Sequence, residues 1–176
     1  MVTPIVFIPG LMCTARIYQH QVEELGQRHP VLLANHWSQA TMKEIAASIL
    51  ETAPESFILA GTSMGGYAAF EIMRQAPGRV EKLIFLSTSA KPDTSERSKG
   101  RREQVAAARK ANNMRNGTKV LYPKLVHPAR HEDQPLLTTF IEMAEQLGLD
   151  AFERQIEAII SREDSRPLLA QIKVPT

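Results

Sequence analysis

The sequence contains very little cysteine, no long apolar run and no signal-like N-terminus. Cys13 is the only cysteine, so an intrachain disulfide is impossible and no oxidising compartment is needed. The apolar run over residues 5–8 stops at Pro9 and Gly10, far short of the roughly 18 apolar residues of a membrane span. The N-terminus lacks the basic segment and small-residue cleavage site of a signal peptide. These absences predict a cytoplasmic protein that does not enter a membrane.

The chain also lacks an excess of charge of either sign. Its 21 Lys and Arg residues nearly balance 19 Asp and Glu residues, leaving a formal net charge of +2. That balance argues against a nucleic-acid footprint or a polybasic membrane anchor. Hydrophobic residues make up 43% of the 176 positions, which is typical of one globular domain. We therefore expect a small molecule as the partner.

Four short apolar runs rich in β-branched residues lie in the first half of the chain. Each is continuously apolar, as are strands buried on both faces of a parallel sheet. Helical periodicity separates the later runs, around residues 45–50 and 68–73. The alternation predicts a doubly wound, mostly parallel α/β sheet. The four runs are residues 5–8, 31–34, 57–60 and 83–86.

The second half of the chain has helical rather than strand-like patterns. Apolar residues recur at helical spacing over residues 136–147 and again over 152–160. We interpret this region as a helical insertion above the sheet. The predicted units are an α/β core over 1–90, a helical cap over 91–165 and a return toward the core over 166–176.

The pattern G-x-S-x-G occurs at Gly61-Thr62-Ser63-Met64-Gly65, directly after one predicted strand and directly before a helix. Such a turn strains the central residue and lifts its side chain above the sheet. Ser63 is the candidate nucleophile, and the Met64 N–H at the helix start is a candidate oxyanion donor. The alternative is a glycine-rich turn that only packs the helix against the sheet. No phosphate-loop pattern is present, so nucleotide binding is not expected.

A second glycine-containing loop follows the first predicted strand. Gly10 allows this loop to approach closely, and the Leu11 N–H is the second candidate oxyanion donor. An ordinary turn after a strand is the alternative. Cys13, nearby, is expected to be a small packed residue rather than a nucleophile.

These segments resemble the α/β-hydrolase family, especially compact bacterial esterases, enol-lactone hydrolases and pimeloyl-carrier-protein-esterase-like members. Residues 5–10 resemble its third strand and oxyanion loop, and 60–67 its nucleophile elbow. Residues 91–165 loosely resemble its helical cap, and 172–176 the lead-in to its next strand. The resemblance implies acyl transfer to water through a serine ester, with no metal and no organic cofactor.

The sequence departs from the family pattern in three places. Pro9 replaces the histidine usually found before the loop glycine, and the family's first antiparallel strand pair is not evident. The resemblance also places the catalytic acid and then the histidine in the loops that follow two further strands, which would come after Thr176. Asp93 is a candidate acid, because some members take theirs after the strand corresponding to 83–86, although a turn or helix cap is the alternative.

The histidines within the chain are weaker candidates for the base, because a lone loop histidine is usually a solvated side chain. Three precede Ser63 and two lie in the predicted cap. They are His20, His29, His36, His127 and His131.

Two functions follow from these features. The first is a serine hydrolase of a carboxylic ester, lactone or thioester with a small to medium acyl group, bound in an apolar pocket under the cap. The second is a non-catalytic or degenerate domain that binds a ligand or partner. In the second case, missing strands would leave the sheet edge beside residues 83–86 unpaired, which favours association of two copies through that edge.

Overall fold

The computed structural model describes residues 2–176, and its centre is a parallel sheet of four strands in the order β2-β1-β3-β4. This confirms the predicted parallel α/β architecture. Two strands are longer than predicted, because β3 continues to Thr62 and β4 begins at Val80. The strands are β1 (Ile5–Ile8), β2 (Val31–Leu33), β3 (Phe57–Thr62) and β4 (Val80–Leu86).

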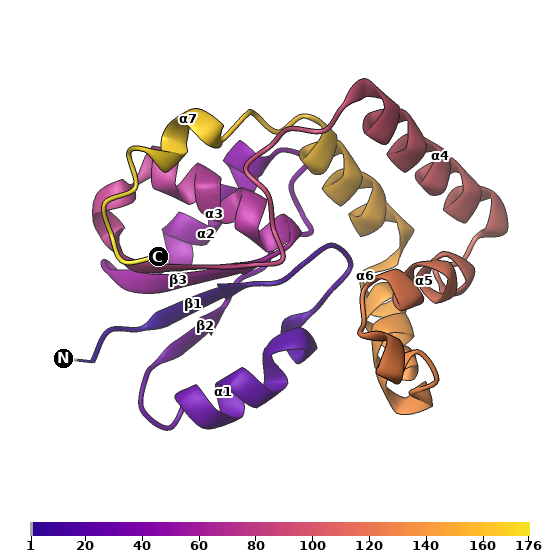
Figure 1. Ribbon diagram of the computed structural model, residues 1–176, viewed down its shortest axis with the longest axis horizontal. Helices are drawn as coiled ribbons and strands as arrows, with labels where there is room; N and C mark the ends of the chain where they lie inside the picture. Colours follow the sequence, from indigo (N-terminus) through magenta and orange to yellow (C-terminus); the bar gives the residue numbers. More distant parts are fainter. Residues whose placement is uncertain (1) are drawn as a thin grey trace.

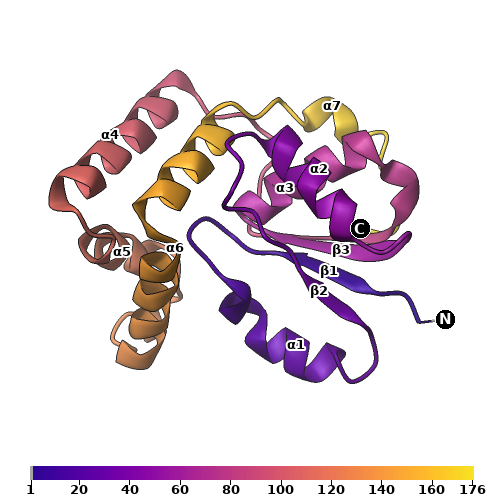
Figure 2. The same cartoon turned by 180° about the vertical axis from the view of Figure 1, so that it is seen from behind.

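Alternate strand residues enter two different cores, one on each face of the sheet. Val6, Ile8 and Leu59 pack under α2 (Met42–Thr52) and α3 (Met64–Gln75). The other face is covered by a 3-10 turn (Ala15–Tyr18) and α1 (Gln19–Leu25), as Figures 1 and 2 show from opposite sides. The sheet is therefore the middle of three layers.

The chain changes direction across the sheet between β1 and β3. The loop after β1 leads to α1 on one face, whereas the loop after β3 leads to α3 on the other. In open parallel sheets, ligands bind at the carboxyl ends of the strands at such a switch point. Ile8 pairs with Gly61 in the last register position of β1 and β3, so the two glycine-containing loops emerge side by side.

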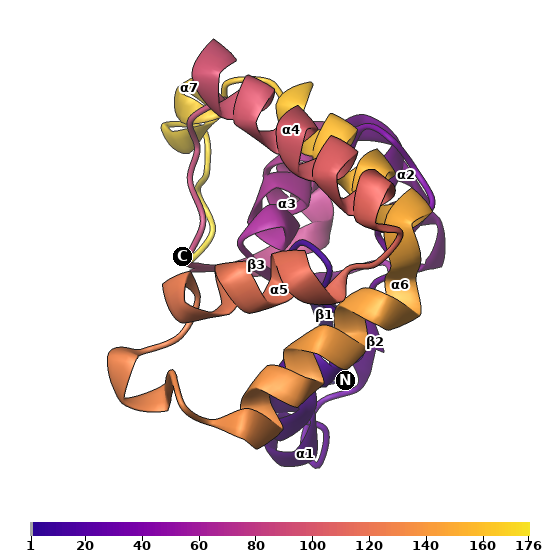
Figure 3. The same cartoon turned by 90° about the vertical axis from the view of Figure 1, so that its right-hand side faces the viewer.

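Three helices lie beyond this end of the sheet, as seen from the side in Figure 3. They are α4 (Ser95–Ala111), α5 (Arg115–Leu121) and α6 (Gln134–Ile160). The two helices predicted over 136–147 and 152–160 are the two halves of α6. They are separated by Gly148, whose φ of 77° and ψ of 177° break the helical path.

Arginines of α4 and α5 join these helices to α6. Arg109 bonds Glu153 at 2.5 Å and Arg115 bonds Glu145 at 3.1 Å, and no residue of α4 is buried. The remaining short helices are 3-10 turns at Pro77–Arg79, Tyr122–Lys124 and Pro128–Arg130, and α7 (Arg166–Leu169). Within the part of the chain described, no helix is long and apolar enough to cross a bilayer.

The end of the chain lies beside the outer edge of β4. The Leu83 N–H donates to the Pro175 carbonyl oxygen at 2.9 Å. On the α1 side of the sheet, Ile84 is 42% exposed and Leu86 is 41% exposed. Association of two copies through this edge stays a prediction.

Candidate active site

Ser63 stands at the junction of β3 and α3 in a strained backbone conformation. Its φ is 52° and its ψ is −112°, a combination that non-glycine residues rarely adopt. Its N–H donates to the Leu86 carbonyl oxygen at 2.8 Å, and its own carbonyl oxygen accepts from Thr88 Oγ1 at 2.8 Å. The peptide groups on both sides of Ser63 are therefore held by β4 and the residues after it.

The glycines around Ser63 are required by close backbone approach. A Cβ on Gly65 would overlap the carbonyl oxygen of Ile8, and a Cβ on Gly61 would lie 2.5 Å from the Gly65 carbonyl oxygen. A Cβ on Gly66 would overlap the side chain of Thr88. Helix α3, which begins directly after Ser63, thus contacts the end of β1 without intervening side chains.

A buried tyrosine joins the ends of the two central strands. The Tyr18 hydroxyl lies 3.0 Å from the Ile8 carbonyl oxygen and 2.6 Å from Thr62 Oγ1, and the residue is 2% exposed. Burial raises the pKa of this hydroxyl, although its hydrogen bonds with Thr62 act in the opposite direction. Tyr18 is therefore a neutral support for the turn that contains Ser63.

The loop after β1 lies directly against Ser63. A Cβ built on Gly10 would be 3.6 Å from Ser63 Cβ. The Cys13 N–H donates to the Gly10 carbonyl oxygen at 3.1 Å, which closes a tight turn with Met12 at a φ of 55°. Among residues 2–176, the Leu11 N–H forms no hydrogen bond. The Met64 N–H begins α3, where a backbone donor has no partner within the helix.

Two buried side chains beneath this loop were not identified from the sequence as a pair. His36 and Gln155 are both 0% exposed. His36 Nε2 lies 3.0 Å from the Gly10 carbonyl oxygen, and Gln155 Oε1 accepts from the Met12 N–H at 3.0 Å. Burial lowers the pKa of His36 to about 4, although its hydrogen bond to Gly10 opposes the shift. His36 is therefore neutral near pH 7.

Across residues 2–176, no hydrogen bond joins a histidine to Ser63. His36 is engaged with Gly10, and His29 Nδ1 lies 2.9 Å from the Thr3 carbonyl oxygen. The His20 side chain is 91% exposed beside Glu23. In the helical region, His127 Nδ1 accepts from the Ala129 N–H, while the buried Nε2 of His131 has no partner among the described residues.

Asp93 is enclosed by two arginines. Its side chain is 0% exposed, and its oxygens lie 2.5 Å from Arg101 Nε and 2.9 Å from Arg162 Nη2. Burial acts to raise the pKa of Asp93, but the hydrogen bonds and charges of the two arginines outweigh it and lower that pKa below 3.8. Both oxygens are thus engaged in ion pairs, and a role as catalytic acid stays a prediction.

Arg162 connects this ion pair to the helix that follows Ser63. Its guanidinium carbon lies 4.1 Å from the centroid of the Tyr67 ring, and its side chain is 5% exposed. Stacking of a guanidinium on an aromatic ring is favourable when both are shielded from water. The start of α4 and the end of α6 are therefore fixed to α3 through one arginine.

The lone cysteine lies in the loop after β1 but has the wrong chemistry for a nucleophile. Cys13 is buried, and burial raises its thiol pKa to about 12 despite a hydrogen bond to Gly10. A thiol with that pKa is protonated at neutral pH, whereas the thiolate is the reactive form. Among the described residues, no group of three or more His, Cys, Asp or Glu side chains could hold a metal ion.

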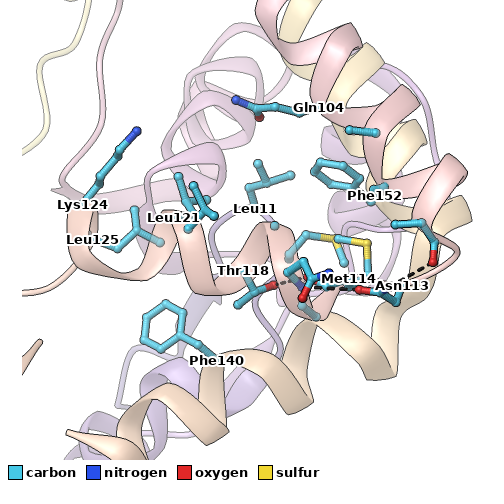
Figure 4. A pocket seen from close by; sticks show the side chains of 18 residues that line it. Leu11, Gln104, Asn113, Met114, Thr118, Leu121, Lys124, Leu125, Phe140 and Phe152 are labelled. Atoms are coloured by element: carbon cyan, nitrogen blue, oxygen red, sulfur yellow. Dashed lines mark hydrogen bonds between the residues drawn. The ribbon is translucent and has the colours of Figure 1, made fainter. Parts of the chain in front are cut away.

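An apolar cavity of about 460 Å³ lies between the helical region and the loop after β1. Figure 4 shows Leu11 at its centre, with Gln104, Leu121 and Phe152 around it and Lys124 at its margin. Lys124 is the only charged side chain that lines it. The cavity is therefore suited to an uncharged chain, and it lies beside Leu11, whose N–H is a candidate oxyanion donor.

Comparison with known proteins identifies the family. A model of the thioesterase domain matches residues 11–171. A pimeloyl-[acyl-carrier protein] methyl ester esterase of Vibrio parahaemolyticus is 34% identical over 95 residues. That match covers 49% of this chain and 37% of the esterase, so it spans little more than a third of this curated relative.

Solved structures show the same fold over nearly the whole chain. A thermophilic esterase from Thermogutta terrifontis has a TM-score of 0.86 at 23% identity, covering 99% of this chain and 69% of that one. The enol-lactonase from Burkholderia xenovorans has a TM-score of 0.82 at 18% identity, covering 99% and 71%. At these identities the likeness establishes the α/β-hydrolase fold.

Proposed function

The chain belongs to the thioesterase-domain family of α/β-hydrolase enzymes, and we propose that it hydrolyses carboxylic esters, lactones or thioesters with Ser63 as nucleophile. The observation that carries this proposal is the backbone at Ser63. A φ of 52° there, held by glycines with no room for a Cβ, is strain of the kind that persists where function needs it. The esterases among its relatives support the same class of reaction.

In the proposed reaction, Ser63 Oγ attacks the substrate carbonyl carbon, and a histidine base takes the hydroxyl proton. We assign this base outside residues 2–176, because no histidine in that range is hydrogen-bonded to Ser63. The Leu11 and Met64 N–H groups stabilise the negative carbonyl oxygen. The bond to the leaving group breaks, the leaving group receives the proton, and water then releases the acyl group from Ser63.

The cavity beside Leu11 supports an acyl group of small to medium size. Its walls are mainly apolar, and its volume of about 460 Å³ is within the range of small-molecule sites. In this proposal the acyl chain extends from Ser63 past Leu11 into the cavity. The expected partner is accordingly a small molecule with an ester-like carbonyl.

The nucleophile is tested by labelling the protein, in the form that its own cell produces, with a fluorophosphonate probe. Intact-mass spectrometry should show one adduct, located at Ser63 by peptide mapping, and none in Ser63→Ala. Ser87→Ala is the matched control, because Ser87 also has a positive φ, of 47°, and should be labelled normally. A folded protein without an adduct would instead support the non-catalytic, ligand-binding alternative.

A further inference from the structure

The loop that carries Leu11 is held from below by two side chains that contribute nothing to the apolar core. Gln155 comes from the second half of α6, and His36 from the loop after β2. Both are fully buried. Burying an amide and an imidazole is unfavourable unless they form hydrogen bonds. Both side chains form such bonds with the backbone of this loop.

His36 fixes the peptide group that contains the Leu11 N–H. The buried Nδ1 of His36 has no partner among residues 2–176, which favours the tautomer with the proton on Nε2, because unpaired buried N–H groups are rare. Nε2 then donates to the Gly10 carbonyl oxygen at 3.0 Å. The Gly10 carbonyl and the Leu11 N–H belong to one planar trans peptide and point in opposite directions. The hydrogen bond from His36 to the Gly10 carbonyl oxygen therefore fixes the direction of the Leu11 N–H.

Gln155 fixes the next peptide group. Its Oε1 accepts from the Met12 N–H at 3.0 Å. Its Nε2 lies 3.3 Å from His36 Nε2, but both nitrogens are donors in this tautomer, so this contact is not a hydrogen bond. Met12 has a φ of 55°, which is strained for a residue other than glycine. Rotation of the peptide group between Leu11 and Met12 would relieve that strain. The hydrogen bond from Met12 to Gln155 opposes that rotation. The peptide group before Leu11 is thus held by His36, and the peptide group after it by Gln155.

We propose that Gln155 is a positioning residue for the oxyanion loop, so that packing of α6 on the core sets the geometry of the Leu11 N–H. This inference rests on the proposed serine hydrolase function. Gln155 does not touch the substrate in this role. It acts through its hydrogen bond with the Met12 N–H, and its effect falls on the transition state, where the charge on the carbonyl oxygen is greatest.

Gln155→Met tests the role, because methionine has a similar length and offers no comparable hydrogen bond. For hydrolysis of p-nitrophenyl butanoate, kcat should fall about tenfold to hundredfold while KM stays within about threefold. Affinity for an alkyl trifluoromethyl ketone, which forms a tetrahedral oxyanion with the serine, should fall by the same factor as kcat/KM. Gln155→Glu retains an acceptor for the Met12 N–H and should recover part of the loss.

Arg154→Gln is the matched control. Arg154 is adjacent to Gln155 on α6, and its Nε donates to the Trp37 carbonyl oxygen at 3.0 Å. The substitution therefore removes another contact between α6 and the core and leaves the hydrogen bonds of the loop after β1 in place. Its kcat should stay within about twofold of the parent protein. Equal losses in Arg154→Gln and Gln155→Met would overturn the proposal in favour of general packing of α6.

Amide hydrogen exchange at Met12 provides a readout that does not need activity. Exchange should accelerate at least tenfold in Gln155→Met and remain unchanged in Arg154→Gln. Faster exchange with an unchanged kcat would overturn the positioning role while leaving the hydrolase function intact. A parent protein with neither a fluorophosphonate adduct nor ester hydrolysis would overturn the proposed function, and this inference with it.

Discussion

The turn around Ser63 and the helical region above it are built on different physical principles. Around Ser63 the backbone itself is constrained, since Gly61, Gly65 and Gly66 have no space for a side chain. In the helical region, Gly100 and Gly117 have no atom within 4 Å of an added Cβ. The comparison indicates that close backbone packing fixes the conformation around Ser63. In the helical region, side chains can be replaced without displacing the backbone.

The largest expected effect comes from making the same substitution in both regions. Gly65→Ala should destabilise the fold by more than about 4 kcal/mol, because the new Cβ would overlap the Ile8 carbonyl oxygen. Gly100→Ala lies within α4 with open space around it and should stabilise the protein by about 0.5–1 kcal/mol. Urea unfolding of the two variants measures both. Equal changes would remove the distinction between the regions.

The next largest effect concerns Asp93, at the junction of the two regions. Asp93→Asn should cost about 3 kcal/mol, because it leaves the charges of Arg101 and the nearly buried Arg162 without their partner. Circular dichroism during thermal unfolding gives the change. If kcat of the folded variant also fell more than about a thousandfold, Asp93 would gain support as the catalytic acid.

The same variant should change the dependence of stability on pH. The folded pKa of Asp93 lies below its ordinary value of 3.8, so its stabilisation is complete above that value. The stabilisation is lost as the pH falls through the folded pKa. Asp93→Asn should therefore have a shallower loss of unfolding free energy below about pH 4 than the parent protein.

The smallest effect is a change of acyl preference with the fold intact. Ala108 lines the cavity from α4, whereas Ala106 is exposed and outside it. Ala108→Phe should lower kcat/KM for an octanoyl ester about tenfold and leave an acetyl ester within about twofold, because it occupies space that only the longer chain needs. Ala106→Phe should change neither. An unchanged octanoyl rate in Ala108→Phe would place the acyl group elsewhere.

The sheet was predictable because its signals are local. A buried parallel strand is an apolar run, and the strand–glycine–serine–glycine–helix sequence around Ser63 describes a turn that only a few backbone conformations satisfy. The gap between the two helical patterns, over residues 148–151, was visible for the same reason. Each of these features is decided by residues within about ten positions of one another.

The helices α4 and α5 were not located from the sequence, because neither has a buried residue. In α4 only a few apolar residues, such as Val105 and Ala108, pack partly buried against the core, so the helical periodicity is weak. Their attachment to α6 depends on ion pairs such as Arg109 with Glu153, across 44 positions. Charged residues at that separation have no sequence pattern that identifies them as partners.

The pairing of His36 with Gln155 was hidden for a further reason. The two lie 119 positions apart, and the sequence indicated His36 only as one of five histidines that could act as a base. Its function in the structure depends on the Gly10 carbonyl, a backbone group that every residue possesses. Backbone acceptors carry no signature in an amino-acid sequence, so such contacts are found only in three dimensions.

The break at Gly148 divides the work of α6 between two halves. Before it, Phe140 lines the cavity. After it, Phe152 also lines the cavity, but Gln155 and Ile156 are buried against the core. We therefore expect substitutions at Phe140 to alter the acyl preference without shifting Gln155 beneath the loop after β1. A single glycine thus separates Phe140, on the wall of the cavity, from the helical turn that carries Gln155, so the two can be altered by separate substitutions.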